Sequence, residues 1–117
     1  MQDIHRHIEP LSLEQIVRFA GAVQDFNPIH YDEDFARAAG LPGIVAQGPL
    51  TYLVTLDSLI AANGLSNVGG FQVRLRAPVM AGMSLLLSCD AEGKVSLKAD
   101  GHEALVGTLK SAKEAAQ

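Results

Sequence analysis

The spacing of apolar residues divides the chain into an N-terminal helical part and a C-terminal part made of strands. Apolar positions recur every three to four residues after Ser12 and again after Gly48, as they do on one face of an α-helix. From residue 71 onward they alternate with polar positions, which is the period of a half-buried β-strand. A weaker alternation over residues 2–9 predicts a short first strand. This order indicates an α+β fold.

The first predicted helix begins at a capping box formed by Ser12 and Gln15. Its periodicity fails at Asp25, and Pro28 disfavours helical geometry for the residue before it. Residues 25–31 are therefore expected to form an ordered, non-helical connection. One face of the helix is expected to be buried by its apolar residues Leu13, Ile16, Val17, Ala20 and Val23.

Two further helices are expected before the strands begin. A short one has Asp32 as its N-cap and Gly40 as its stop signal. The longer one, over residues 49–62, opens with Pro49, whose missing N–H costs nothing at the first helical position. Its apolar residues are spread around most of its circumference, which is typical of a buried helix. They are Leu50, Leu53, Val54, Leu56, Leu59 and Ile60.

Strands are predicted over residues 71–77, 85–89, 94–99 and 104–109. Glu92-Gly93 and Asp100-Gly101 are typical of the tight turns that join antiparallel neighbours. The result is a curved antiparallel sheet with the long apolar helix against it. The alanine-rich tail over residues 111–117 is expected to be frayed.

Composition narrows the class of protein. The 117 residues, 48% hydrophobic and 19% charged, suit one folded domain over residues 1–117. A formal net charge of -4 and the lack of a basic run argue against nucleic acid as a partner. Cys89 is the only cysteine, so no intrachain disulfide can form. Residues 1–10 are polar and no apolar run approaches the ~20 residues of a membrane span, so a cytoplasmic location is expected.

The segment from Asp25 to His30 places a carboxylate and an imidazole at the two ends of a rigid loop. Converging on one water, they would form a general acid–base pair, since histidine titrates near neutrality. The alternative is structural: Asp25 and Asn27 bond their own backbone, and His30 is a half-buried polar residue. The residue types alone favour the structural interpretation, because catalytic pairs are a minority of such clusters.

The surrounding residues resemble a family signature. The stretch 19–32, centred on Asp25-Phe26-Asn27-Pro28-Ile29-His30, is similar to the signature of the MaoC-like, or R-specific enoyl-CoA hydratase, family. The stretches 40–48 and 71–82 resemble the segments that follow in that family, so the resemblance covers roughly residues 12–88. It implies a hot-dog fold, in which a curved antiparallel sheet wraps a long central helix, usually in a dimer.

The resemblance also implies a reaction and a set of roles. The family's hydro-lyases act on trans-2-enoyl thioesters of CoA or acyl carrier protein, need no cofactor, and give (R)-3-hydroxyacyl thioesters. Asp25 and His30 would hold the water and form the catalytic pair, with Asn27 supporting their loop. The backbone N–H of Gly48, at a helix N-terminus, would polarise the thioester carbonyl.

Three further residues are candidates for contacts with the rest of the substrate. Gln47 is a candidate for binding substrate, and Arg74 and Arg76, on one side of their predicted strand, could meet a CoA phosphate. A solvated sheet face is the alternative for both arginines. No metal site is predicted, because the histidines outside the motif have no ligand partners at suitable spacing.

Three residues depart from the family's common pattern. Gln47 stands where histidine is usual, Pro49 where methionine is common, and Leu56 where some members carry a polar residue. These differences favour the mesaconyl-CoA hydratase and hydroxyacyl-thioester dehydratase branch. The expected protein is a homodimeric or larger homo-oligomeric hydratase. The alternatives are a heteromeric subunit active only with a second hot-dog partner, and a non-catalytic acyl-thioester-binding module.

Overall fold

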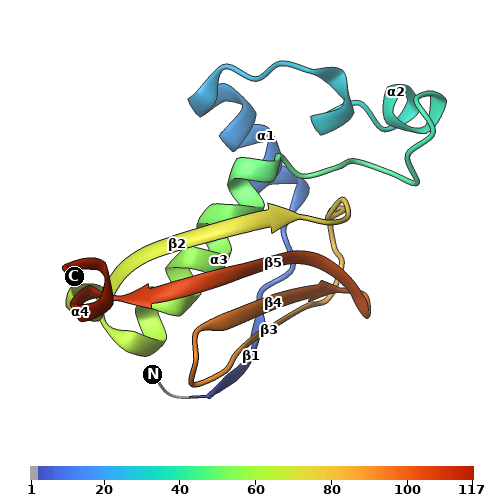
Figure 1. Ribbon diagram of the computed structural model, residues 1–117. Helices are drawn as coiled ribbons and strands as arrows, with labels where there is room; N and C mark the ends of the chain where they lie inside the picture. Colours follow the sequence, from blue (N-terminus) through green and yellow to red (C-terminus); the bar gives the residue numbers. More distant parts are fainter. Residues whose placement is uncertain (1–2) are drawn as a thin grey trace.

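The computed structural model describes residues 3–117, and its centre is a five-stranded antiparallel sheet with one long helix on one face (Figure 1). The strand order is β1-β3-β4-β5-β2, so β1 and β2 form the edges. The strands are β1 (Ile4–Ile8), β2 (Val68–Leu75), β3 (Leu85–Cys89), β4 (Lys94–Ala99) and β5 (His102–Ser111). The predicted α+β hot-dog arrangement is confirmed. Residue 2 of the predicted first strand lies outside the described residues.

Local turn chemistry builds the middle of the sheet. Asp100 and Gly101 both have positive φ, at 48° and 84°, as a two-residue hairpin turn between β4 and β5 requires. Gly93, with φ at 89°, opens β4, and a Cβ there would collide with the carbonyl of Leu109. Both predicted turns are therefore confirmed, and β3, β4 and β5 follow one another as a meander.

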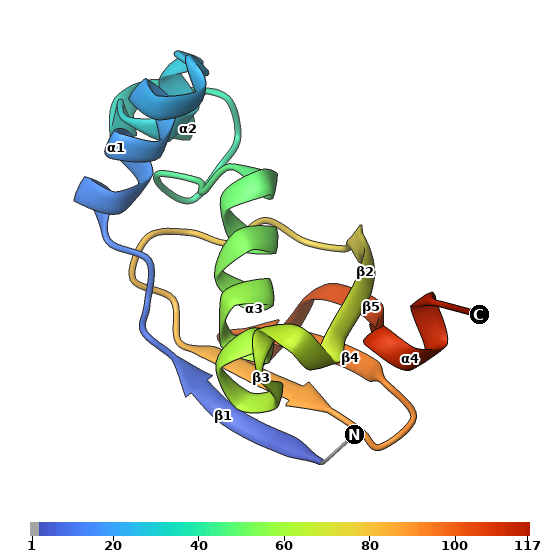
Figure 2. The same ribbon diagram turned by 90° about the vertical axis from the view of Figure 1, so that its left-hand side faces the viewer.

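The helix α3 (Gly48–Asn63) packs against one face of this sheet (Figure 2). Its buried positions are Leu50, Thr51, Thr55 and Leu59, which recur at the spacing of a single helical face. The opposite side is open, since Leu53 is 47% exposed. The expectation that α3 is buried on most sides is therefore wrong, because the sheet covers only one of its faces. The core between them is aliphatic and includes Leu59, Leu85, Leu87, Leu97, Leu105 and Leu109.

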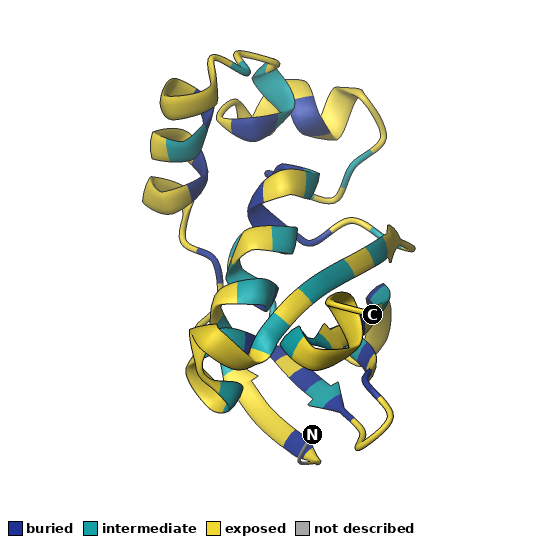
Figure 3. Ribbon diagram, turned by 60° about the vertical axis from the view of Figure 1, so that its left-hand side comes forward, coloured by how far each residue is buried: buried dark blue, intermediate teal, exposed yellow. Residues whose placement is uncertain are grey.

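Three helical segments extend beyond the sheet. These are α1 (Leu13–Val23), the 3₁₀ turn η1 (Pro28–His30) and α2 (Glu33–Ala38), and residues 13–38 are called the overhang below. The helices α1 and α2 make their main contacts with η1 rather than with any strand (Figure 2). Most of the overhang is exposed, as Figure 3 shows.

The predicted buried face of α1 is only partly present. Ile16 and Ala20 are buried, whereas Leu13, Val17 and Val23 are 50%, 42% and 50% exposed. The helix projects past the sheet, so nothing among residues 3–117 covers the rest of its apolar stripe. The helix begins where predicted, with the Ser12 side chain accepting a hydrogen bond from the Gln15 N–H at 3.0 Å, but the return bond from the Gln15 side chain is absent among the described residues, so only half of the predicted capping box forms.

Several boundaries differ from prediction, and β5 is longer than predicted at both ends. The connection over residues 25–31 is not wholly non-helical, because η1 forms a 3₁₀ turn directly after Asn27. The tail is not simply frayed: α4 (Ala112–Ala115) is closed by a complete capping box between Ser111 and Glu114. The strand β2 starts at Val68, earlier than expected, after the short 3₁₀ turn η2 (Leu65–Asn67). Among residues 3–117, no helix is long and apolar enough to cross a membrane.

Candidate active site

Asp25 and His30 meet at the end of the overhang. The Oδ2 atom of Asp25 lies 3.3 Å from Nε2 of His30. Asp25 follows α1 directly, where Gln24 adopts a left-handed conformation that turns the chain away from the helix axis. His30 closes η1, and the five-residue spacing therefore brings the two side chains together, as the catalytic interpretation requires.

The loop between them is held by its own side chains. Oδ1 of Asp25 accepts a hydrogen bond from the Asn27 N–H, and Oδ1 of Asn27 accepts one from the Ile29 N–H, both at 3.3 Å. The Tyr31 hydroxyl donates to the Phe26 carbonyl at 3.0 Å. The bonds of Asp25 and Asn27 are the ones that the structural interpretation predicts. They occur together with the Asp25–His30 contact, so one carboxylate both shapes the loop and faces the imidazole.

The ring of His30 is fixed from its other side. Nδ1 of His30 lies 2.7 Å from the carbonyl oxygen of Val45, and the Val45 N–H donates to the Ile29 carbonyl at 3.2 Å. A carbonyl oxygen only accepts, so Nδ1 carries a hydrogen. Nε2 is then the nitrogen that gains or loses a proton opposite Asp25.

The contact between His30 Nε2 and the Asp25 carboxylate has room for one proton. A neutral His30 presents the Nε2 lone pair to the carboxylate, and two acceptors 3.3 Å apart need a shared proton between them, because this separation leaves no room for a water. The His30 side chain is 8% exposed, whereas the Asp25 side chain is 43% exposed. The pair is thus open to solvent through the aspartate, and a water beside Asp25 can exchange protons with either group.

A second polar element lies nearby in the chain, at the start of α3. Gly48 follows Val45 by three residues, and its N–H has no hydrogen-bond partner among the described residues. The N-terminus of a long helix favours negative charge on a ligand. A hollow of about 320 Å³ opens beside it, and Thr51 and Arg76 contribute to its lining. The other residues of that lining are Ala46, Leu75, Ala77, Pro78 and Val79.

The remaining predicted contacts fall in different places. Arg76 lines the hollow next to Gly48, whereas Arg74 lies within β2, directly across from Val106, and does not. Gln47 is 2% exposed, is absent from that lining, and its Nε2 donates to the carbonyl of Ile16 at 2.9 Å. The structure therefore joins Arg76 to the Gly48 region and separates Arg74 from it. A role for any of the three in binding substrate stays a prediction.

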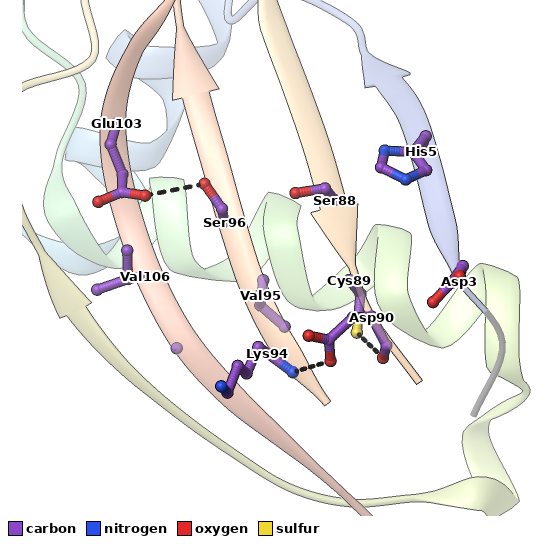
Figure 4. Close-up of a pocket in the computed structure, with 11 residues that line it drawn as sticks. Asp3, His5, Ser88, Cys89, Asp90, Lys94, Val95, Ser96, Glu103 and Val106 are labelled. Atoms are coloured by element: carbon purple, nitrogen blue, oxygen red, sulfur yellow. Dashed lines mark hydrogen bonds between the residues drawn. The ribbon is translucent and has the colours of Figure 1, made fainter. Parts of the chain in front are cut away.

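A larger hollow, of about 520 Å³, lies elsewhere (Figure 4). His5, Ser88 and Ser96, which are paired across β1, β3 and β4, line it on the face of the sheet turned away from α3. None of the predicted site residues contributes to it. Size alone therefore does not identify the reactive site in this fold. Within residues 3–117, no group of three or more His, Cys, Asp or Glu side chains could hold a metal ion.

Two contributors were not predicted from the sequence. Val45 acts through its backbone carbonyl, which leaves no trace in the residue type. Thr51 lines the Gly48 hollow and is 3% exposed, and its hydroxyl faces back toward the Gln47 carbonyl at 3.4 Å. In the sequence, the signal that could have identified Thr51 was a threonine one turn after the start of the predicted helix.

Comparison with known proteins identifies the family of the chain. A family model described as "MaoC like domain" matches residues 3–113. Two UPF0336 proteins, from two strains of Mycobacterium tuberculosis, are 55% identical over 40 residues, which are 34% of this chain and 23% of each relative. The chain thus matches about a quarter of the length of these curated relatives.

Solved structures extend the comparison over the whole fold. A MaoC-like dehydratase is 30% identical with a TM-score of 0.80, and the match covers 92% of this chain and 38% of that one. An R-hydratase from Pseudomonas aeruginosa gives a TM-score of 0.75 at 18% identity, covering 95% and 79% of the two chains. A ChsH1-ChsH2 complex from Mycobacterium tuberculosis gives 0.74 at 20% identity, covering 95% and 92%. The last two likenesses establish the fold alone.

Proposed function

The chain belongs to the MaoC-like domain family, and from this premise we propose that it is a hydro-lyase acting on a trans-2-enoyl thioester. The observation that carries the proposal is the contact between Asp25 and a His30 ring whose other nitrogen is fixed by Val45. Such a pair, open to water on the aspartate side, is suited to general acid–base chemistry at neutral pH. Neither group needs a metal or a cofactor for this.

The proposed reaction moves one water across one double bond. The water oxygen bonds to C3 of the enoyl group and gives one proton to the pair formed by His30 Nε2 and Asp25. The pair returns one proton to C2, so it ends as it began. Negative charge that develops on the thioester oxygen is stabilised by the Gly48 N–H at the start of α3. The reverse sequence removes water from a 3-hydroxyacyl thioester.

The test is hydration of crotonyl-CoA by the purified chain and by Asp25→Asn and His30→Gln. Each substitution should lower kcat by about 10²- to 10⁴-fold, the usual contribution of a general acid or base. Asp57→Asn and His7→Gln are matched controls, because both side chains are exposed and outside the site. Full activity in both site variants overturns the proposal.

A second experiment identifies the acyl group of the substrate. A panel of straight-chain, branched and dicarboxylic enoyl-CoA thioesters, with the stereochemistry of each product determined, distinguishes the mesaconyl-CoA hydratase branch from the others. An (R)-3-hydroxyacyl product is expected. Tight binding of such thioesters without turnover would instead support an acyl-binding module.

We also propose that the chain works as an oligomer. Large apolar side chains remain exposed along the overhang, on α3 and on β2, among them Phe26, Phe35, Leu53 and Leu75. A folded monomer rarely exposes so many on neighbouring elements. Sedimentation of the purified chain should give a homodimer or larger homo-oligomer. A monomer that becomes active only with a second hot-dog chain would support the heteromeric alternative.

A further inference from the structure

Gln47 joins the two halves of the proposed site. It is the residue directly before Gly48, and its side-chain amide reaches the carbonyl of Ile16 in α1, 31 residues earlier, at 2.9 Å. Ile16 is fully buried and Gln47 is 2% exposed, so water does not compete for this bond.

Few polar contacts fasten the overhang to the rest of the molecule. Among residues 3–117, three hydrogen bonds join the overhang to the chain beyond Gly43. They link Ile29 to Val45, His30 to Val45, and Ile16 to Gln47. The extended segment that carries them is itself held on its other side, where Val45 pairs with Met80 and the Ala46 N–H donates to the Val79 carbonyl.

The two anchors act on different members of the catalytic pair. Val45 binds the ring of His30 directly. Gln47 binds α1, and Asp25 follows that helix, with its N–H bonded to the Ala20 carbonyl at 3.0 Å. The separation between Asp25 and His30 therefore depends on Val45 and Gln47. Val45 sets the position of His30, and Gln47 sets the position of the helix that carries Asp25.

The second polar atom of the Gln47 amide indicates why the residue is there. Oε1 is buried and has no hydrogen-bond partner among the residues that the structure describes. An apolar side chain of similar length would fill the same space without an unpaired acceptor, so packing alone does not explain a glutamine. The remaining contribution is the N–H that holds α1.

We propose that Gln47 is a positioning residue, which aligns Asp25 with His30 and with the Gly48 N–H by tying α1 to the start of α3. The inference rests on the proposed hydro-lyase function and adds a residue that touches neither substrate nor water. It predicts that loss of the Gln47 N–H lowers the rate of the chemical step while substrate binding and the fold are kept.

The experiment compares three replacements at this position. Gln47→Met keeps the length and removes the donor, and Gln47→Glu is isosteric but presents no N–H when ionised. Gln47→His restores a donor at the same number of bonds from Cα, since Nε2 of both side chains lies four bonds away. A matched control is Asn63→Leu, which removes an amide-to-carbonyl bond at the far end of α3.

Two readouts are taken on each variant. With crotonyl-CoA, the Met and Glu variants should lose about 10- to 100-fold in kcat, as small misalignments do, with KM changed less than about threefold. Hydrogen exchange of α1 amides should become faster in both, while β3, β4 and β5 stay protected. The His variant should recover kcat and protection, and Asn63→Leu should leave both unchanged.

The outcomes separate the two proposals. If the wild-type chain does not hydrate crotonyl-CoA or any thioester of the panel, the proposed function fails, and exchange in α1 alone decides whether Gln47 holds the overhang. If Gln47→Met keeps the wild-type kcat and the wild-type exchange in α1, the positioning role is wrong. A parallel loss of kcat and of protection throughout the sheet also overturns it, because that pattern is general destabilisation.

Discussion

Nδ1 of His30 lies 2.7 Å from the carbonyl oxygen of Val45, fifteen residues away, and this contact fixes which ring nitrogen faces Asp25. In the neutral state His30 should therefore carry its hydrogen on Nδ1. Long-range proton–nitrogen NMR of the ring should report that tautomer. His7, which is exposed on β1, is the internal comparison. A neutral His30 protonated on Nε2 would contradict the geometry.

Substitution of Gly48 by alanine should reduce activity with little loss of stability. A Cβ at this position would lie 2.6 Å from Cδ1 of Leu75. Leu75 is 50% exposed, so its side chain can turn away, and unfolding free energy should fall by less than about 1 kcal/mol. The methyl group would still crowd the hollow beside the Gly48 N–H, and kcat/KM for crotonyl-CoA should drop about tenfold or more.

The control for that crowding is the pair of variants Leu75→Ala and Gly48→Ala/Leu75→Ala. The double variant removes the collision without clearing the methyl group from the hollow. Its stability should match that of Leu75→Ala, and its activity should stay low. Recovery of activity in the double variant would show that the clash, rather than the hollow, accounts for the loss.

Arg76 and Arg74 should behave differently. Arg76 lines the hollow next to Gly48 and Arg74 does not, so Arg76→Gln should raise KM for a CoA thioester by about threefold or more. The effect should be smaller with a thioester that lacks the CoA phosphates, and it should shrink at high salt. Arg74→Gln is the matched control. Equal effects of the two substitutions would mean that the hollow does not receive the phosphates.

Cys89 should be unreactive in the folded chain. Burial, and then the neighbouring Asp90, raise the pKa of its thiol above the ordinary value of 9.0. At pH 8 a thiol reagent should modify it far more slowly than free cysteine until denaturant unfolds the chain. Rapid modification of the native protein would contradict this.

The same raised pKa gives stability a definite dependence on alkaline pH. The unfolded chain releases the thiol proton at lower pH than the folded one. Stability is therefore full below the ordinary pKa and falls as the pH rises from there toward the raised, folded value. Urea unfolding of wild type and Cys89→Ala between pH 7 and pH 10 measures the difference.

Acid should loosen α4 before the rest of the molecule. Hydrogen bonds from the backbone and side chain of Ser111 lower the pKa of Glu114 below its ordinary value of 4.5. The stabilising effect of the ionised carboxylate is present above that value and is lost as the pH falls through the lowered one. Amide NMR signals of residues 112–115 should follow this titration, and Glu114→Gln should remove it. An unchanged pH response in Glu114→Gln would exclude the carboxylate as the cause.

Local signals in the sequence were sufficient for the three central strands, β3, β4 and β5. The Asp100-Gly101 turn and the alternation on either side of it depend on residues that are neighbours in the chain. The exposed stripe of α1 could not be foreseen in the same way, because burial depends on what lies opposite a helix. Val17 has the right spacing for a buried face and is 42% exposed, since no element in the described part of the chain covers it.

The candidate site shows the same difference between features that local sequence predicts and features that depend on distant parts of the chain. The motif predicted that Asp25 and His30 act together, and they lie within 3.3 Å. The sequence does not reveal that a carbonyl at Val45 holds the imidazole, because any residue supplies a carbonyl. Nor does it reveal the partner of Gln47, because a bond across 31 residues requires the path of the whole chain.

The pairing of β1 with β3 has a consequence for how the chain is made. Ile4 of β1 pairs with Cys89 of β3, whereas β3, β4 and β5 are joined by turns of a few residues. Hairpins of that kind close within microseconds, and contacts between distant segments form later. During synthesis β1 leaves the ribosome long before β3, its partner in the sheet, has been made. The edge of β1 is open for all of that time, so a newly made chain is vulnerable to wrong pairing at β1.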